Sequence, residues 1–115
     1  MTASLTVELS TGVFDDPSSE NLPRSFALDQ NYPNPFNAGT VISYVLAGDG
    51  HTTLQVFDVL GRTVATLVDE MQPMGRHRLS WDGRDARGLP VASGVYFYRL
   101  TAGQDIESRT MILLK

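Results

Sequence analysis

The side chains that could carry out catalytic chemistry in this chain are few and scattered. The sequence contains no cysteine and two histidines. His51 falls in a predicted turn, and His77 lies on the same predicted strand face as Trp81, where we expect a hydrogen-bonded histidine of the sheet. Ser43 and Ser93 have no nucleophile-elbow motif around them. A catalytic triad needs a nucleophile and a base within hydrogen-bond reach, so none is expected.

Two loop carboxylates offer the best case for a metal ion. Asp82 and Asp85 could each lend an oxygen ligand to Ca²⁺, which prefers carboxylate and carbonyl oxygens. The spacing does not match an EF-hand loop, and the alternative is that Asp82 caps a turn while Asp85 is solvated. Ca²⁺ is the one cofactor that the sequence leaves open. The short loops leave little material for a cleft between paired carboxylates, so we expect a protein that is not an enzyme.

The size and charge of the chain limit the classes of protein to which it could belong. A chain of 115 residues can bury one core, with 42% apolar and 19% charged residues. The formal net charge is −4 and no basic patch stands out, so a nucleic-acid partner is not expected. No apolar run approaches the roughly 20 residues of a membrane helix. The first residues lack the pattern of a signal peptide, and we expect an excised piece of a longer protein.

The chain divides into a short N-terminal part and one domain. Residues 5–9 alternate apolar and polar side chains, which predicts a strand remnant. Residues 14–24 are acidic and contain two prolines, a composition typical of a linker. We therefore place the remnant and linker at residues 1–24 and the domain at residues 25–115.

Alternating apolar residues predict about seven short strands and no helix in the domain. Counting the strand remnant at residues 5–9, these strands are predicted at residues 40–46, 52–58, 63–68, 76–81, 95–101 and 106–114. This spacing is typical of an antiparallel all-β sandwich, with Trp81 and the tyrosines Tyr44, Tyr96 and Tyr98 in its core.

Three connections have distinctive compositions. Residues 31–37 contain two prolines and three asparagines, and they predict a rigid surface corner anchored by Tyr32 and Phe36. Residues 58–62 form a tight hairpin turn, in which Gly61 takes a positive φ and Asp58 and Arg62 have structural roles. Residues 69–75 read as a looser link.

Five segments together resemble one known family. They are FALDQNYPNPFN at residues 26–37, VFDVLGRTV at 56–64, WDGRD at 81–85, PVASGVYFY at 90–98 and MILLK at 111–115. In this order and spacing they resemble the C-terminal sorting domains (type A) of the bacterial type IX secretion system. The resemblance covers residues 25–115.

The resemblance implies a fold, a function and partners. The fold would be an Ig-like sandwich, similar also to the Ig-like domain of flagellar hook-capping proteins. The domain would direct an upstream cargo protein through the periplasm and across the outer membrane to the cell surface or the medium. Its partners would be the outer-membrane translocon and a surface transpeptidase that removes the domain and anchors the cargo. Gly94, Tyr96, Arg109 and Lys115 are the residues expected to be recognised by the translocon.

Two other functions stay open. Phe57, Phe97 and Tyr32, if they lined one sheet face, would favour a carbohydrate-binding or adhesive module attached to a hydrolase. A hook-capping-like structural domain would instead self-assemble. In isolation we expect a monomer or a weak homodimer, because an exposed last strand invites pairing between sheet edges.

Overall fold

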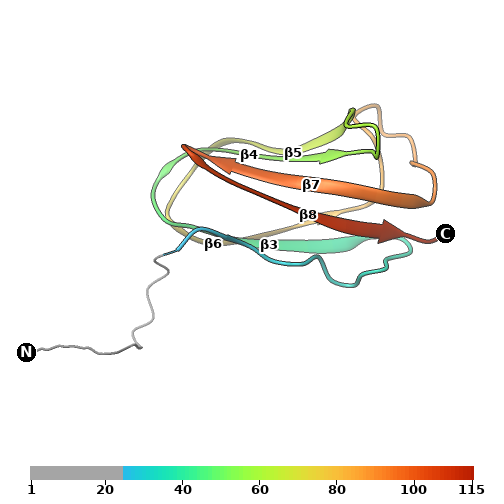
Figure 1. Ribbon diagram of the computed structural model, residues 1–115, viewed down its shortest axis with the longest axis horizontal. Helices are drawn as coiled ribbons and strands as arrows, with labels where there is room; N and C mark the ends of the chain where they lie inside the picture. Colours follow the sequence, from blue (N-terminus) through green and yellow to red (C-terminus); the bar gives the residue numbers. More distant parts are fainter. Residues whose placement is uncertain (1–24) are drawn as a thin grey trace, which may run out of the picture.

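The computed structural model describes residues 25–115, which form two antiparallel sheets packed face to face (Figure 1). One sheet has the strand order β2-β3-β6 and the other has the order β5-β4-β7-β8. The strands are β2 (Ala27–Leu28), β3 (Thr40–Leu46), β4 (Gly50–Phe57), β5 (Thr63–Gln72), β6 (Gly75–Trp81), β7 (Gly94–Ala102) and β8 (Asp105–Leu113). The predicted all-β sandwich of about seven strands is confirmed. The strand and linker predicted within residues 1–24 lie outside the described residues.

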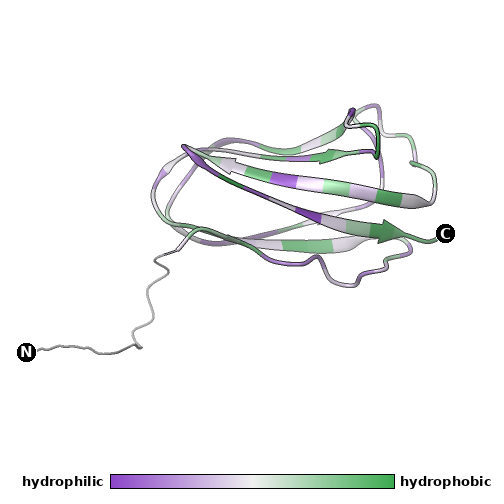
Figure 2. Cartoon of the chain, viewed as in Figure 1, coloured by the Kyte–Doolittle hydropathy of each residue, from purple (hydrophilic) through white to green (hydrophobic). Residues whose placement is uncertain are grey.

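The core forms because side chains on a strand point alternately to opposite faces. Along β7, Tyr96, Tyr98 and Leu100 are buried and their neighbours are not. Figure 2 shows apolar and polar bands along this strand, but these bands do not coincide with burial because the hydropathy scale rates tyrosine as mildly polar. Trp81 is also buried, and its ring lies 5.7 Å from that of Phe36 and 5.9 Å from that of Tyr96. Tilted and edge-on aromatic pairs of this kind contribute about 1 kcal/mol each beyond the area they bury. The prediction that Trp81 and three tyrosines fill the core is confirmed.

The prediction of a loose link at residues 69–75 is wrong. β5 continues to Gln72, because β4 begins at Gly50 and pairs with it along this whole length. Only Pro73 and Met74 separate β5 from β6, and the Met74 N–H donates to Asp49 Oδ1 at 2.7 Å. The polar side chains of this part of β5 hid the strand, since an edge strand can expose both faces to water.

The corner at residues 31–37 is anchored differently from the prediction. Phe36 is buried as expected, but Tyr32 is 79% exposed and anchors nothing with its side chain. Asn31 is the second buried residue. Its backbone N–H donates to Tyr98 Oη at 2.8 Å, and its Nδ2 donates to Thr40 Oγ1 at 2.9 Å. A buried amide is tolerated because these bonds replace its bonds to water.

The last strand is an edge of its sheet, but its outer backbone groups near the C-terminus are occupied. The Phe36 N–H donates to the Ile112 carbonyl and the Leu114 N–H donates to the Phe36 carbonyl, both at 2.9 Å. The Ile112 N–H donates to Asn34 Oδ1 at 2.9 Å, and Gln30 Nε2 donates to the Thr110 carbonyl at 2.7 Å. We call these contacts of residues 28–37 with β8 the closed seam. They correct the expectation that this stretch of edge is free to pair.

We predict that Tyr98→Phe destabilises the domain. The Tyr98 hydroxyl accepts from Asn31 N–H and donates to the Asp29 carbonyl at 2.7 Å, and burial raises the pKa of Tyr98 to about 12. Removing the hydroxyl leaves a buried N–H and a carbonyl unpaired, which costs about 1–3 kcal/mol. Urea denaturation of the variant measures this loss. Tyr32→Phe is the control and should leave the free energy of unfolding unchanged.

Candidate recognition surface at the C-terminal end

The five family-like segments converge on one end of the sandwich. This surface, which we call the C-terminal end, consists of the loops 33–39, 58–62 and 82–93 together with residues 113–115, and it lies beside the label C in Figure 1. A parallel bridge between Phe36 and Leu113 joins two of its parts. A hollow of about 340 Å³ is lined there by Asn37, Gly83 and Lys115. Phe36 and Leu113, which are 77 positions apart in sequence, therefore lie side by side at this end.

Two of the predicted recognition residues build the sandwich itself. Tyr96 is 7% exposed, and its hydroxyl donates to the Ala92 carbonyl at 2.6 Å, four residues upstream. This bond has the form of the tyrosine corner of Ig-like folds. Burial, helped by the negative charge of Asp58, raises the pKa of Tyr96. Gly94 starts β7 with φ of +154°, a value that disfavours other residues. Neither residue presents a side chain for recognition.

Arg109 lies away from the C-terminal end and joins the two sheets. Its Nε donates to the Leu28 carbonyl, while the Leu28 N–H donates to Glu107 Oε1 at 2.9 Å. The two side chains thus hold both backbone polar groups of one residue of β2, and they lie 3.8 Å from each other. The Arg109 side chain is 38% exposed, so part of it stays accessible. Its position gives it a structural role in the closed seam.

Lys115 is the predicted residue that does present its side chain at this end. Its backbone N–H donates to Ser93 Oγ at 3.0 Å, and the preceding carbonyl, of Leu114, accepts from Asn37 Nδ2 at 3.0 Å. The terminal backbone is therefore held while the side chains of Leu114 and Lys115 stay exposed. The chain presents its last residues in a defined position.

Sequence reasoning missed the exposed apolar side chains of the C-terminal end. Val59, Leu60, Leu89 and Leu114 are 64%, 74%, 51% and 54% exposed, and all belong to the C-terminal end. The available signal was an apolar pair inside the Asp-x-x-Gly turn at residues 58–61, where polar residues are the rule. Exposed apolar side chains grouped in this way are typical of a surface that contacts another protein.

One carboxylate, that of Asp58, holds the hairpin turn at residues 58–62 together. Asp58 Oδ1 accepts the N–H groups of Leu60 and Arg62 at 2.9 and 3.0 Å, and Oδ2 pairs with Arg62 Nε at 2.8 Å. Gly61 has φ of +83°, as the prediction required. Burial acts to raise the pKa of Asp58, but the bonds from Arg62 and Leu60 outweigh it and lower the pKa. Asp58, Gly61 and Arg62 thus all take part in the hydrogen bonds or the backbone geometry of this turn.

A second turn repeats this geometry. Asp85 Oδ1 accepts the N–H groups of Arg87 and Leu89 at 2.9 and 3.0 Å, and Gly88 has φ of +82°. The bond from Leu89 lowers the pKa of Asp85, burial opposes it, and the bonds from Arg87 add to the lowering. The two turns line one hollow of about 560 Å³, and the Ala86 N–H donates to the Val64 carbonyl at 3.1 Å. The alternative that Asp85 is simply solvated is wrong.

These bonds occupy the carboxylate oxygens that could otherwise bind a cation. Asp85 is engaged by its own turn, and Asp82 accepts the Arg84 N–H at 3.2 Å with Oδ1 and faces Arg84 Nε at 3.7 Å with Oδ2. Within residues 25–115 no group of three or more metal-ligating side chains comes together. Asp82 thus caps a turn, as the alternative to a Ca²⁺ site predicted.

The remaining ring side chains are accounted for by packing. The His77 ring is stacked on Tyr44 at 5.3 Å, and its Nε2 lies 2.8 Å from the Pro73 carbonyl, as expected for a sheet histidine. Phe57 and Phe97 are cross-strand neighbours on the larger sheet, and Arg99 lies 4.6 Å above the Phe57 ring. Tyr32 pairs with β3 of the other sheet. The three aromatic residues therefore do not form one strip for a sugar.

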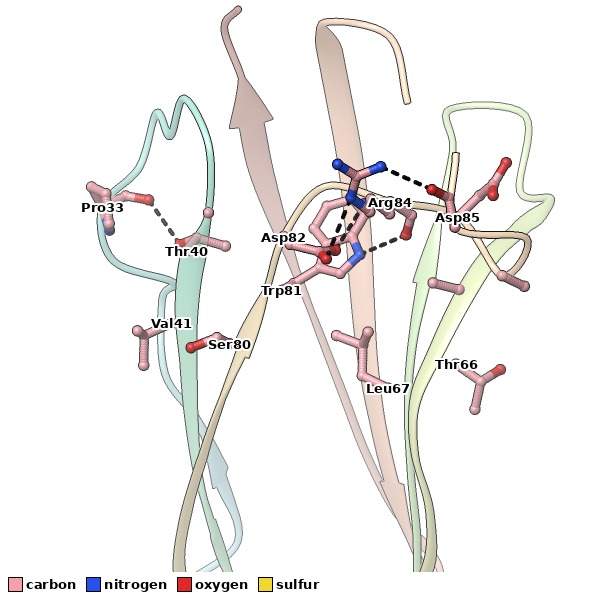
Figure 3. A pocket seen from close by; sticks show the side chains of 14 residues that line it. Pro33, Thr40, Val41, Thr66, Leu67, Ser80, Trp81, Asp82, Arg84 and Asp85 are labelled. Atoms are coloured by element: carbon pink, nitrogen blue, oxygen red, sulfur yellow. Dashed lines mark hydrogen bonds and ion pairs between the residues drawn. The ribbon is translucent and has the colours of Figure 1, made fainter. Parts of the chain in front are cut away.

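A larger hollow of about 790 Å³ lies near this end, between β6 and β5 (Figure 3). Trp81 forms part of its wall, and the Trp81 Nε1–H donates to the Arg84 carbonyl at 2.9 Å. Ala65 and Leu67 line the opposite side. The charged groups around the hollow are paired within their own loops, so its inner surface is mainly apolar. In residues 25–115 no helix is long and apolar enough to cross a membrane.

The comparisons with known proteins agree with this architecture. The family model described as the FlgD Ig-like domain matches residues 34–105, which is more than half of the chain. The chain therefore belongs to the family of FlgD Ig-like domains, and the predicted Ig-like fold is confirmed. A search of curated proteins gave no match.

Solved structures with the same fold include two proteins from Porphyromonas gingivalis and FlgD from Xanthomonas campestris. Dimeric latent PorU from Porphyromonas gingivalis matches with a TM-score of 0.62 and 18% identity, over 78% of this chain and 9% of that one. PorZ, described as an essential bacterial surface component of the type-IX secretion system of the same organism, matches with a TM-score of 0.52 and 20% identity, over 78% and 11%. FlgD from Xanthomonas campestris matches with a TM-score of 0.52 and 18% identity, over 79% and 63%. The chain thus spans about a tenth of the PorU and PorZ chains.

We predict that the two Asp turns make the domain sensitive to acid. Because the folded pKa values of Asp58 and Asp85 are lowered, their stabilisation is present above the unfolded pKa near 4 and is lost as the pH falls through the folded values. In a double Asp58→Asn, Asp85→Asn variant, unfolding midpoints between pH 7 and pH 2 should therefore depend less on pH than in the parent. Asp105→Asn, which loses a charge but no hydrogen bond recorded in residues 25–115, is the control. An unchanged pH profile in the double variant would contradict the assignment.

Proposed function

We propose that this chain is a C-terminal sorting domain of the type IX secretion system. It directs an upstream cargo protein from the periplasm across the outer membrane to the surface or the medium. The five segments at residues 26–37, 56–64, 81–85, 90–98 and 111–115 support this function through their order and spacing. The likeness to PorZ, a surface component of that system, is consistent with it but by itself speaks for the fold. The domain contributes no chemistry in this function.

The observation that carries the proposal is the convergence of these segments on the C-terminal end. A sorting signal made of a folded surface needs side chains held in fixed positions, because ordering flexible ones would reduce the binding free energy. Here Ser93 and Asn37 hold the terminal backbone, and the two Asp turns fix the loops that carry Leu60 and Leu89 at the same end of the sandwich. The translocon would contact these apolar side chains and Lys115.

Arg109 supports the same surface indirectly in this proposal. By holding Leu28 it fixes residues 28–37, and these residues hold Ile112 and Leu114. After export, a surface transpeptidase would cut the chain N-terminal to the domain and attach the cargo to the cell surface. The translocon, the transpeptidase and the cargo are partners by proposal.

An export assay tests the function. A reporter protein carrying a periplasmic export signal is fused to the N-terminus of residues 1–115 and expressed in a host with a type IX system. We predict that the wild-type fusion reaches the surface or the medium. We predict that Leu114→Asp combined with Lys115→Glu holds the reporter in the periplasm, as for a reporter without the domain.

The matched control uses the same strand. Ile106 is 62% exposed on β8 at the opposite end of the sandwich, so Ile106→Asp makes the same kind of apolar-to-acidic change as Leu114→Asp, at a similar exposure, outside the C-terminal end. It should be exported normally. Equal thermal midpoints for the purified variants would exclude misfolding as the cause. Export of the double variant, or retention of the control, would contradict the proposal.

A further inference from the structure

The two long sides of the sandwich differ in whether the outer backbone groups of their edge strands have hydrogen-bond partners. On one side, the closed seam occupies the edge of β8 near the C-terminus. On the other side β6 and β5 are the outer strands of their sheets and do not pair with each other. We call this side the open seam. Near the C-terminal end of the sandwich, the Ala86 N–H donates to the Val64 carbonyl of β5. Among residues 25–115, no such backbone bond reaches the outer edge of β6.

The pairing of β3 determines which backbone groups of β6 lack a hydrogen-bond partner within the sheet. Val41 exchanges both of its backbone hydrogen bonds with Tyr32, so the odd-numbered residues of β3 face β2. In an antiparallel ladder alternate residues bond to opposite sides, and the even-numbered residues of β3 therefore bond to β6. Their register partners are Gly75, His77, Leu79 and Trp81. The N–H and C=O groups of Arg76, Arg78 and Ser80 consequently point outward.

The side chains on this edge carry charge without a partner. Arg76 and Arg78 are exposed on the outer face of the smaller sheet, opposite Val45 and Ser43. The ion pairs within residues 25–115 involve neither arginine. On the inner face, the edge of β6 meets the mainly apolar hollow lined by Trp81 and Leu67 (Figure 3).

From this geometry we propose that β6 binds an extended polypeptide segment in which acidic residues alternate with apolar ones. The segment adds a strand to the smaller sheet and bonds to the outward backbone groups of Arg76, Arg78 and Ser80. Its acidic side chains lie on the outer face beside the two arginines. Its apolar side chains point inward, and the one nearest Trp81 enters the hollow. This inference does not depend on the proposed sorting function.

Charge complementarity decides between this occupant and a second copy of the chain. Pairing two β6 edges antiparallel would bring the arginines of both copies onto one face, and like charges on neighbouring strands destabilise a sheet. Charged residues on an edge strand also protect proteins against such self-pairing. If protection were the only role of the arginines, reversing their charge would promote self-association and leave peptide binding unaffected.

The test uses the full chain of 115 residues and a capped peptide of alternating valine and glutamate. We predict that the peptide slows hydrogen exchange at the amides of Arg76, Arg78 and Ser80, measured by NMR, and changes the fluorescence of Trp81. An Arg76→Glu, Arg78→Glu variant should bind about tenfold more weakly, as expected when two attractive contacts become repulsive. A peptide of alternating valine and lysine should not bind the parent chain.

The control is Arg99→Glu, which makes one substitution of the same kind on the other sheet, over Phe57. It should bind the glutamate peptide within about twofold of the parent, since it lies off the proposed edge. Protection at β8 instead of β6, equal binding of the lysine peptide, or an unchanged affinity of the double variant would each overturn the proposal. Dimerisation of the parent chain through the same amides, seen by sedimentation, would assign the edge to a second copy.

Discussion

The backbone hydrogen bonds between Phe36 and the end of β8 are the constraint on which the rest of the structure depends. They join a segment of the smaller sheet to the last strand of the larger one, and so close one side of the sandwich. Apolar burial alone holds two sheets together without fixing their relative position, because the hydrophobic effect has no direction. The hydrogen bonds of Asn31, Asn34 and Arg109 add that direction. The corner at residues 31–37 is therefore part of the packing of the C-terminal strand.

The C-terminal end shows how a small domain can present a defined surface built from short turns. Two Asp-x-x-Gly turns, each closed by its own carboxylate and a glycine of positive φ, hold apolar side chains exposed to solvent. The cost of exposing them is offset by the core, in which Trp81, Phe36 and Tyr96 pack together. The charged groups of these turns serve structure, and the apolar side chains of the turns are left exposed.

The open seam and the closed seam give the two sides of the molecule different properties. On the closed side the edge of β8 is covered near the C-terminus, and Glu107 and Arg109 hold the neighbouring strand. On the open side, and among residues 25–115, β6 keeps free backbone groups, two arginines without an ion-pair partner, and an adjoining hollow. The difference follows from topology, since residues 28–37, which connect β2 to β3, contact β8 on one side of the sandwich.

The sequence by itself determined the all-β class, most strand positions, the buried Trp81 and tyrosines, and the turn at residues 58–62. These depend on local alternation and on turn residues, and both can be read from neighbours in sequence. Tertiary structure alone decided that Asn31 is buried in place of Tyr32, that Arg109 holds Leu28, and that β6 is left open. Each of these depends on a partner 9 to 81 positions away, or on the order of strands in a sheet. Local pattern carries no information about such pairs, because it specifies which face a side chain occupies and not which segment lies opposite.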